Sequence, residues 1–150
     1  MSGRQAESKT RIWRRARGPI LIVDDDMDDA GLTKRAVESL RPAASVRVIQ
    51  SGKELINYLE GQEPYADRAA HPLPAVVLLD LRMPEMDGFA VLEWVKNRAD
   101  YAQIPIVAVS GLSDSEHMKR AFALMARSYL FKPISMDSLH GTLSSLNILF

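Results

Sequence analysis

Charged and hydroxyl side chains stand at the ends of four short apolar runs of this sequence. The run ILIV leads into Asp24 and Asp25, AVVLL leads into Asp80, and two later runs lead into Ser110 and Lys132. In an open parallel sheet, ligands bind beyond the carboxyl ends of the strands, so side chains at these positions can meet. Carboxylates that face a hydroxyl and an ammonium indicate a site that binds a cation and an anion together.

The clustered carboxylates predict a divalent metal ion. Crowded carboxylates repel one another and raise each other's pKa unless a cation neutralises them. The chain contains no cysteine, which excludes disulfides, thiolate metal sites and a cysteine nucleophile. Mg²⁺ fits best, because it prefers oxygen ligands, keeps several waters and completes its octahedron with a substrate phosphate.

Simpler structural roles exist for the same acids. The acidic segment 24–29 could be a helix start, where carboxylates cap free N–H groups, and this explains Asp26 and Asp28 better than Asp24 and Asp25. An aspartate that ends a strand, such as Asp80, often only begins a turn. The segment that follows, LRMPEMDG, indicates a further role for Asp80. Its proline and Asp-Gly pair predict a tight loop into the next helix, which would hold the Asp80 carboxylate at the edge of the sheet.

The hydroxyl and the amine have simpler roles as well. Lys132 could be a solvated surface lysine, but Pro133 follows it, and a cis peptide there could aim its side chain inward. Ser110 could be a turn or cap residue. Gly111 beside it would let an anion approach the backbone N–H groups.

Short apolar runs alternate with helical patterns from Pro19 onward, which indicates an α/β fold with a five-stranded parallel sheet and helices on both faces. Several runs are continuous rather than alternating, as expected for strands buried on both faces. We predict strands at Ile20–Val23, Val46–Ile49, Ala75–Leu79, Ile106–Val109 and Tyr129–Phe131. We predict helices near Asp28–Leu40, Lys53–Leu59, Phe89–Lys96, Asp114–Met125 and Met136–Leu146.

Two of these helices carry apolar stripes that we expect to pack in the core. The stripes consist of Leu32, Ala36, Val37 and Leu40 in the first helix and of Met118, Ala121, Phe122 and Met125 in the fourth. The connection over residues 60–74 is rich in loop-forming residues and is predicted to be a long surface loop.

Length and composition fit one domain over residues 19–150, preceded by a basic arm over residues 1–18. The arm holds six basic side chains and one acid, which leaves a net charge of −5 on the rest of a formally neutral chain. It is either a flexible tail or a segment that docks on a partner or on nucleic acid. With no apolar stretch long enough for a membrane span and no secretory signal, we expect a cytoplasmic protein without a membrane anchor.

The segments ILIVDDD, VVLLDLRMPEMDG, IPIVAVSG and YLFKP, in this order, resemble the receiver domain of response regulators. The resemblance covers about Pro19 to Leu146 and implies the flavodoxin-like (βα)5 receiver fold. It implies that the protein is a stand-alone response regulator of a two-component phosphorelay. We expect no output domain, and in particular no DNA-binding domain.

The resemblance also implies the chemistry. Asp80 would be the nucleophile and phospho-acceptor, and a phosphohistidine on a sensor histidine kinase would be the donor. Mg²⁺ would be bound directly by Asp25 and Asp80, through water by Asp24, and by the backbone carbonyl of Arg82. The protein would catalyse its own phosphorylation and later dephosphorylation, without being an enzyme that turns over a separate substrate.

Other residues would bind the phosphoryl group and report its presence. Lys132 would contact the transferred phosphoryl, and Ser110 would bond to it once it is in place. Tyr129, at the aromatic switch position of the family, would turn inward in step with Ser110. The backbone groups that would bind the phosphoryl belong to Leu81, Arg82 and Gly111.

The long loop, with its PYADR segment, further resembles small receivers that partner phytochrome-type histidine kinases, so the kinase could be a bacteriophytochrome. Without an attached effector, output must be a binding event. We expect a homodimer through the face of the fourth helix, fifth strand and fifth helix and through the apolar C-terminal tail, unless the tail packs on its own domain. The apolar tail residues are Leu146, Ile148, Leu149 and Phe150.

Three other functions fit the sequence less well than the receiver does. A phosphohydrolase of the haloacid dehalogenase type needs a second carboxylate two residues after the nucleophile, where this chain has Arg82. A flavodoxin-like FMN protein needs a Ser, Thr and Gly-rich phosphate loop, where this chain has DDDMDD. A receiver that signals without phosphorylation should lack one of the key groups, and all of them are present.

Overall fold

The computed structural model describes residues 18–111 and 115–148. The basic arm up to residue 17, the predicted start of the fourth helix at Asp114, and the last two tail residues lie outside the described residues. Within the described ranges, no helix is long and apolar enough to cross a membrane.

Five parallel strands form one sheet in the order β2-β1-β3-β4-β5, which is the strand order of flavodoxin-like folds and confirms the predicted fold class. The strands are β1 (Ile20–Val23), β2 (Val46–Ile49), β3 (Val76–Asp80), β4 (Ile106–Ser110) and β5 (Ser128–Phe131). Asp80 and Ser110 were predicted to follow their strands but are the last residues of β3 and β4, because the ladder pairs Asp80 with Val109 and Ser110 with Phe131.

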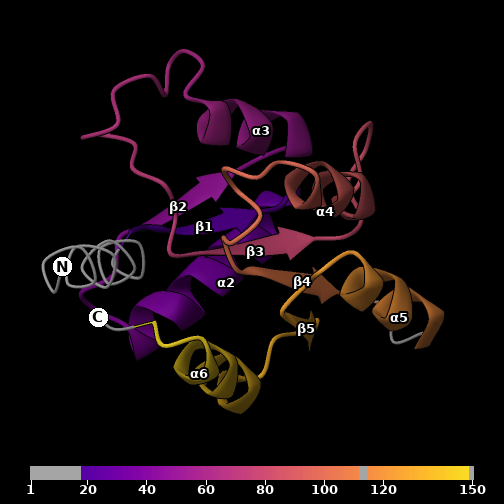
Figure 1. The fold of residues 1–150 in the computed structure, drawn as a ribbon. Helices are drawn as coiled ribbons and strands as arrows, with labels where there is room; N and C mark the ends of the chain where they lie inside the picture. Colours follow the sequence, from indigo (N-terminus) through magenta and orange to yellow (C-terminus); the bar gives the residue numbers. More distant parts are fainter. Residues whose placement is uncertain (1–17, 112–114, 149–150) are drawn as a thin grey trace, which may run out of the picture.

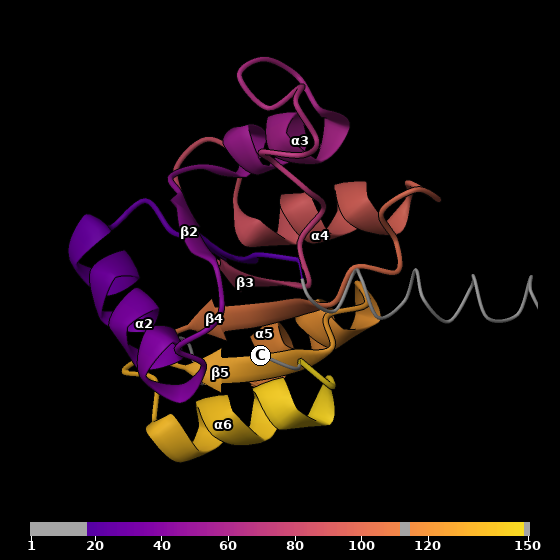
Figure 2. The ribbon, with the colours of Figure 1, turned by 90° about the vertical axis from the view of Figure 1, so that its left-hand side faces the viewer.

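Helices cover both faces of the sheet, with α3, α4 and α5 on one face and α2 and α6 on the other (Figures 1 and 2). Their bounds are α2 (Met27–Leu40), α3 (Gly52–Glu60), α4 (Gly88–Lys96), α5 (Ser115–Ala123) and α6 (Met136–Ser145). Four of them begin at a capping side chain that accepts a backbone N–H bond. The caps are Asp26, Ser51, Asp87 and Ser135.

The sheet separates two apolar cores. Leu21 and Val23 of β1 face the α3, α4 and α5 side, whereas Ile20 and Ile22 face α2 and α6. All four side chains are at most 2% exposed, which explains why the strand reads as a continuous apolar run. The rigid layers hold the carboxyl ends of the strands in fixed positions.

The predicted core stripes are correct only in part. Val37 and Ala121 are fully buried, but Leu32 is 59% exposed, Phe122 44% and Met125 62%. In α2, the residues that face the sheet are Ala30, Thr33 and Val37. Leu32 therefore lies on the flank of this face, and Met125 lies beyond the end of α5 with a positive φ of 74°.

The long loop between α3 and β3 lies on the surface as predicted, but it is tied down by hydrogen bonds. The Arg68 guanidinium donates to the carbonyl oxygens of Tyr58 at 2.8 Å and His71 at 3.0 Å, and also to that of Leu59. The Tyr58 hydroxyl donates to the carbonyl oxygen of Pro72 at 2.7 Å. Arg68 thus joins the last turn of α3 to the loop, since two of its acceptors, Tyr58 and Leu59, belong to that turn and the third, His71, belongs to the loop.

We expect Arg68→Ala to lower the free energy of unfolding by about 1–3 kcal/mol, because it removes the hydrogen bonds from a charged guanidinium to three part-buried carbonyl groups. The loop should also become more sensitive to limited proteolysis. The matched control is Lys119→Ala, whose ion pair with Glu116 is exposed, and its effect should stay within about 0.5 kcal/mol. Urea unfolding measures both, and equal effects of the two variants would contradict the assigned role of Arg68.

Candidate functional site

Asp24 stands directly after β1 and is buried, with 3% of its surface exposed. Its Oδ1 accepts a hydrogen bond from the backbone N–H of Asp26 at 3.0 Å. Asp26 in turn caps α2, as its Oδ1 accepts from the backbone N–H groups of Asp28 and Asp29 at 2.9 and 3.1 Å. The capping role proposed for this acidic segment therefore holds for Asp26, while Asp24 is left facing the sheet edge.

Asp80 lies at the end of β3, next to β1 in the sheet, and is 6% exposed. Its Oδ1 accepts a hydrogen bond from the backbone N–H of Arg82 at 2.9 Å. The loop behind it closes tightly, since the N–H of Gly88 donates to the carbonyl oxygen of Leu81 at 3.1 Å. A Cβ on Gly88 would lie 2.6 Å from the carbonyl oxygen of Asp80, so the loop requires glycine here.

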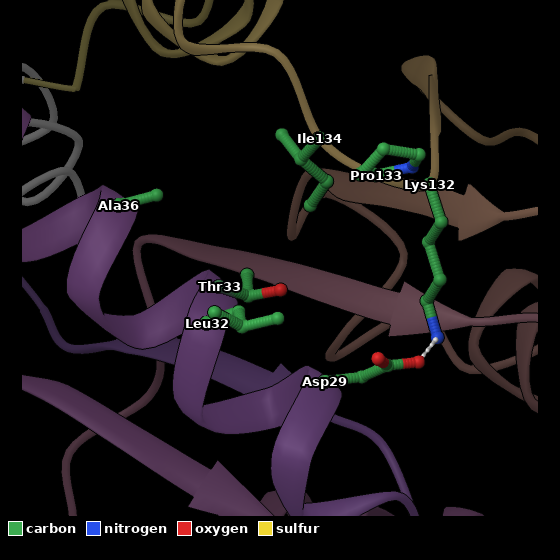
Figure 3. A pocket seen from close by; sticks show the side chains of 7 residues that line it. All are labelled: Asp29, Leu32, Thr33, Ala36, Lys132, Pro133 and Ile134. Carbon is green, nitrogen blue, oxygen red and sulfur yellow. Dashed lines mark hydrogen bonds and ion pairs between the residues drawn. The ribbon is translucent and has the colours of Figure 1, made fainter.

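Lys132 follows β5 and brings the carboxylates together. Its Nζ donates to Oδ2 of Asp24 at 3.1 Å, to Oδ2 of Asp80 at 3.1 Å and to Oδ2 of Asp29 at 3.0 Å. The peptide bond between Lys132 and Pro133 is cis, the isomer that Pro133 made possible. Figure 3 shows Lys132 extending from the end of its strand to Asp29 on the first turn of α2.

Asp29 is the site residue that the sequence analysis missed. An acid in the first turn of a helix is explained by the helix dipole alone, so residue type and position carried no separate signal for it. Only the packing of α2 against the sheet brings its carboxylate to the ammonium.

The site shifts the pKa of two of its groups. Burial lowers the pKa of Lys132, but hydrogen bonds to Asp29, Asp24 and Asp80 outweigh burial and raise it above its usual value. Burial raises the pKa of Asp24, and the Asp26 amide and Lys132 oppose this shift only in part. The ammonium therefore stays charged and neutralises carboxylates that would otherwise repel one another.

Three carboxylates could hold a metal ion, as predicted: Asp24, Asp25 and Asp80 each offer one oxygen, and these oxygens lie within 4.8 Å of one another. Asp25 is exposed whereas the other two are buried, so the cluster opens to solvent on one side. Such a set of hard oxygen ligands fits Mg²⁺ with waters in its remaining positions.

Two predicted backbone donors have other partners in this conformation. The N–H of Leu81 donates to the carbonyl oxygen of Val109 in β4 at 3.1 Å, so this donor is already occupied by a backbone hydrogen bond. The N–H of Arg82 donates to Asp80 itself. The role of the Arg82 carbonyl as a metal ligand stays a prediction.

The predicted switch residues lie on β4 and β5. Ser110 is 1% exposed, and Gly111 beyond it is exposed. Tyr129 was expected to turn inward on phosphorylation, but its ring is already buried here, with 8% exposed. The Tyr129 ring centroid lies 5.2 Å from that of Phe131, whose backbone pairs with Ser110.

Comparisons with known proteins agree with this geometry. The family described as response regulator receiver domain matches residues 20–144. The probable methanogenesis regulatory protein FilR2 of Methanothrix harundinacea is 33% identical over 127 residues, covering 85% of this chain and 79% of that protein. Among solved structures, the bacteriophytochrome response regulator AtBRR is similar with a TM-score of 0.78 and 32% identity, covering 89% of this chain and 94% of that one. The bacteriophytochrome response regulator RtBRR has a TM-score of 0.78 and 28% identity, covering 89% and 80%.

We expect Gly88→Ala to lower the free energy of unfolding by about 1–3 kcal/mol, because the added methyl group overlaps the backbone of β3. The control is Gly141→Ala in α6, where a Cβ meets nothing within 4 Å, and this exchange should stabilise the fold by about 0.5–1 kcal/mol. Chemical unfolding measures the free energy of unfolding of both variants and should show a decrease for Gly88→Ala and an increase for Gly141→Ala. A neutral Gly88→Ala would show that the loop behind Asp80 tolerates a side chain.

Proposed function

This chain belongs to the response regulator receiver domain family, and we propose that it accepts a phosphoryl group on Asp80 from a phosphohistidine of a sensor histidine kinase. The observation that carries the proposal is the meeting of Lys132 with two buried carboxylates. Its Nζ lies 3.1 Å from an oxygen of Asp80 and 3.1 Å from an oxygen of Asp24. A carboxylate and an ammonium so close at an open sheet edge suit transfer of an anionic group.

In the proposed reaction, a carboxylate oxygen of Asp80 attacks the phosphorus of the phosphohistidine. The new O–P bond forms as the P–N bond breaks, and the electron pair of that bond stays on the imidazole, which takes up a proton. Later, water attacks the phosphorus of the acyl phosphate, which releases inorganic phosphate and restores the Asp80 carboxylate. The chain supplies positioning and charge stabilisation and does not turn over a separate substrate.

Mg²⁺ held by Asp25 and Asp80, by Asp24 through water and by the Arg82 carbonyl would neutralise charge on the transferring phosphoryl. The Lys132 ammonium would help to neutralise the same charge. Because the acids come from β1 and β3 and the lysine from the end of β5, the rigid sheet sets their spacing.

The proposed switch couples Ser110 to Tyr129. The Ser110 hydroxyl would bond to the phosphoryl group, and the loop after it would move toward the site. Phosphorylation would then favour the inward position of Tyr129 that this structure shows. The surface around β5 would change with it.

We propose a bacteriophytochrome-type kinase as the donor, and light signalling as the context. Support comes from the two bacteriophytochrome response regulators that this chain resembles over most of its length. The proposal places the reaction in the cytoplasm, in agreement with the expectation from the sequence.

The phospho-acceptor is tested with Mg²⁺ and acetyl phosphate, followed by intact mass. Wild type should gain one acid-labile phosphoryl group, Asp80→Asn should gain none, and removal of Mg²⁺ by EDTA should abolish the gain. Asp137→Asn, which changes an exposed acid in the first turn of α6, is the matched control and should react like wild type. An equal gain in Asp80→Asn, or no gain in wild type, would overturn the proposal.

We propose that the protein forms a homodimer through the surface of α5, β5 and α6. Large apolar side chains stand exposed there, with Phe122 at 44%, Met125 at 62% and Phe131 at 43%. The tail contributes less than predicted, because Ile148 is 3% exposed and packs in its own core. The predicted role of the last two tail residues concerns positions outside the described part of the chain.

We expect sedimentation of wild type to show a mass that rises with concentration toward a dimer, and Phe122→Glu to remain a monomer. A charge placed in an apolar interface loses its water without gaining a partner, which weakens association. Met27→Glu is the control, since Met27 is 46% exposed at the start of α2 and contacts Gln50 after β2, the edge strand opposite β5. A monomeric wild type at every concentration would contradict the dimer.

A further inference from the structure

The ammonium of Lys132 has no donor left for a phosphoryl group. A lysine ammonium carries three N–H donors, and the Nζ of Lys132 already bonds to Asp24, Asp29 and Asp80 at 3.0–3.1 Å. An incoming phosphoryl oxygen can therefore be bound by Lys132 only if one of these carboxylates gives up its hydrogen bond.

The three carboxylates differ in how costly it is for each to lose its hydrogen bond from Lys132. The side chains of Asp24 and Asp80 are 5% and 7% exposed, and both belong to the oxygen cluster that could hold a metal. The Asp29 side chain is 41% exposed and lies outside that cluster. Water can replace the ammonium at Asp29 at small cost, whereas a buried carboxylate without a partner is costly.

The surroundings of Asp29 stabilise its carboxylate even without the hydrogen bond from Lys132. It stands on the first turn of α2 at the rim of an apolar pocket of about 240 Å³, with Lys132 across from it (Figure 3). The helix begins at Met27, so its N-terminal dipole favours the Asp29 carboxylate whether or not the ammonium is bound.

We propose that Asp29 is a positioning residue that holds Lys132 in the unphosphorylated site and yields it when the phosphoryl group arrives. The inference rests on the proposed function of Asp80. In the resting site, the Asp29 charge draws the ammonium toward α2 and repels the phosphate of an approaching donor. Asp29 therefore sets how readily the site accepts a phosphoryl group, without touching that group itself.

The test compares Asp29→Asn, which removes the charge but keeps a hydrogen-bond acceptor, with wild type at saturating Mg²⁺. The first measurement is the rate of phosphorylation by acetyl phosphate, and the second is the affinity for beryllofluoride, a stable mimic of the phosphoryl group. We expect Asp29→Asn to be phosphorylated about threefold faster and to bind beryllofluoride about threefold more tightly, as the loss of one partly exposed ion pair allows.

Two further variants separate this role from general effects. Asp28→Asn removes the same charge from the neighbouring exposed position of α2, and both of its values should equal those of wild type. Asp29→Glu keeps the charge and should restore values close to wild type. A merely structural role would lower the melting temperature of Asp29→Asn and leave its rate and affinity unchanged.

The outcomes are distinct. If wild type reacts but Asp29→Asn reacts at the same rate or more slowly, or if Asp28→Asn gains as much, the role of Asp29 is wrong while the function of Asp80 stands. If wild type neither becomes phosphorylated nor binds beryllofluoride, the proposed function is overturned and this inference with it.

Discussion

The structure depends on one electrostatic balance, the pairing of the Lys132 ammonium with aspartates at the carboxyl edge of the sheet. Asp24 and Lys132 are 108 residues apart in the chain, yet their charged atoms lie 3.1 Å apart. Buried carboxylates are unfavourable unless a cation compensates them. The fold must therefore place the Lys132 ammonium beside the buried aspartates. The same balance keeps charged groups of both signs together at one edge of the sheet, which the proposed phosphoryl transfer requires.

Backbone packing sets the geometry on which this balance relies. Strands buried on both faces hold their carboxyl ends in register, and the tight approach of Gly88 to β3 anchors the loop behind Asp80. The dense cores resist small displacements, so a change at the carboxylates can reach the surface as a shift of whole side chains or loops. Ser110 and Tyr129, the residues of the proposed switch, lie on the adjacent strands β4 and β5.

The surface divides into regions with different roles. The α2 side carries a pocket lined by Leu32, Asp29 and Lys132. The α5 and β5 side exposes Phe122 and Phe131, which the proposed dimer would cover. The long loop after α3 is held by Arg68 and is bound by Arg47 of β2, at the opposite edge of the sheet from β5.

The sequence by itself determined the α/β class, the strand positions and the acceptor role expected of Asp80, because continuous apolar runs and the residues at their ends are local patterns. It could not reveal that Asp29 binds Lys132, since an acid in a first helical turn has the same local explanation with or without that contact. Nor could it show that Tyr129 is buried while Phe122 is exposed. Those facts follow from how α2 and α5 rotate and pack against the sheet, and only the tertiary structure decides that.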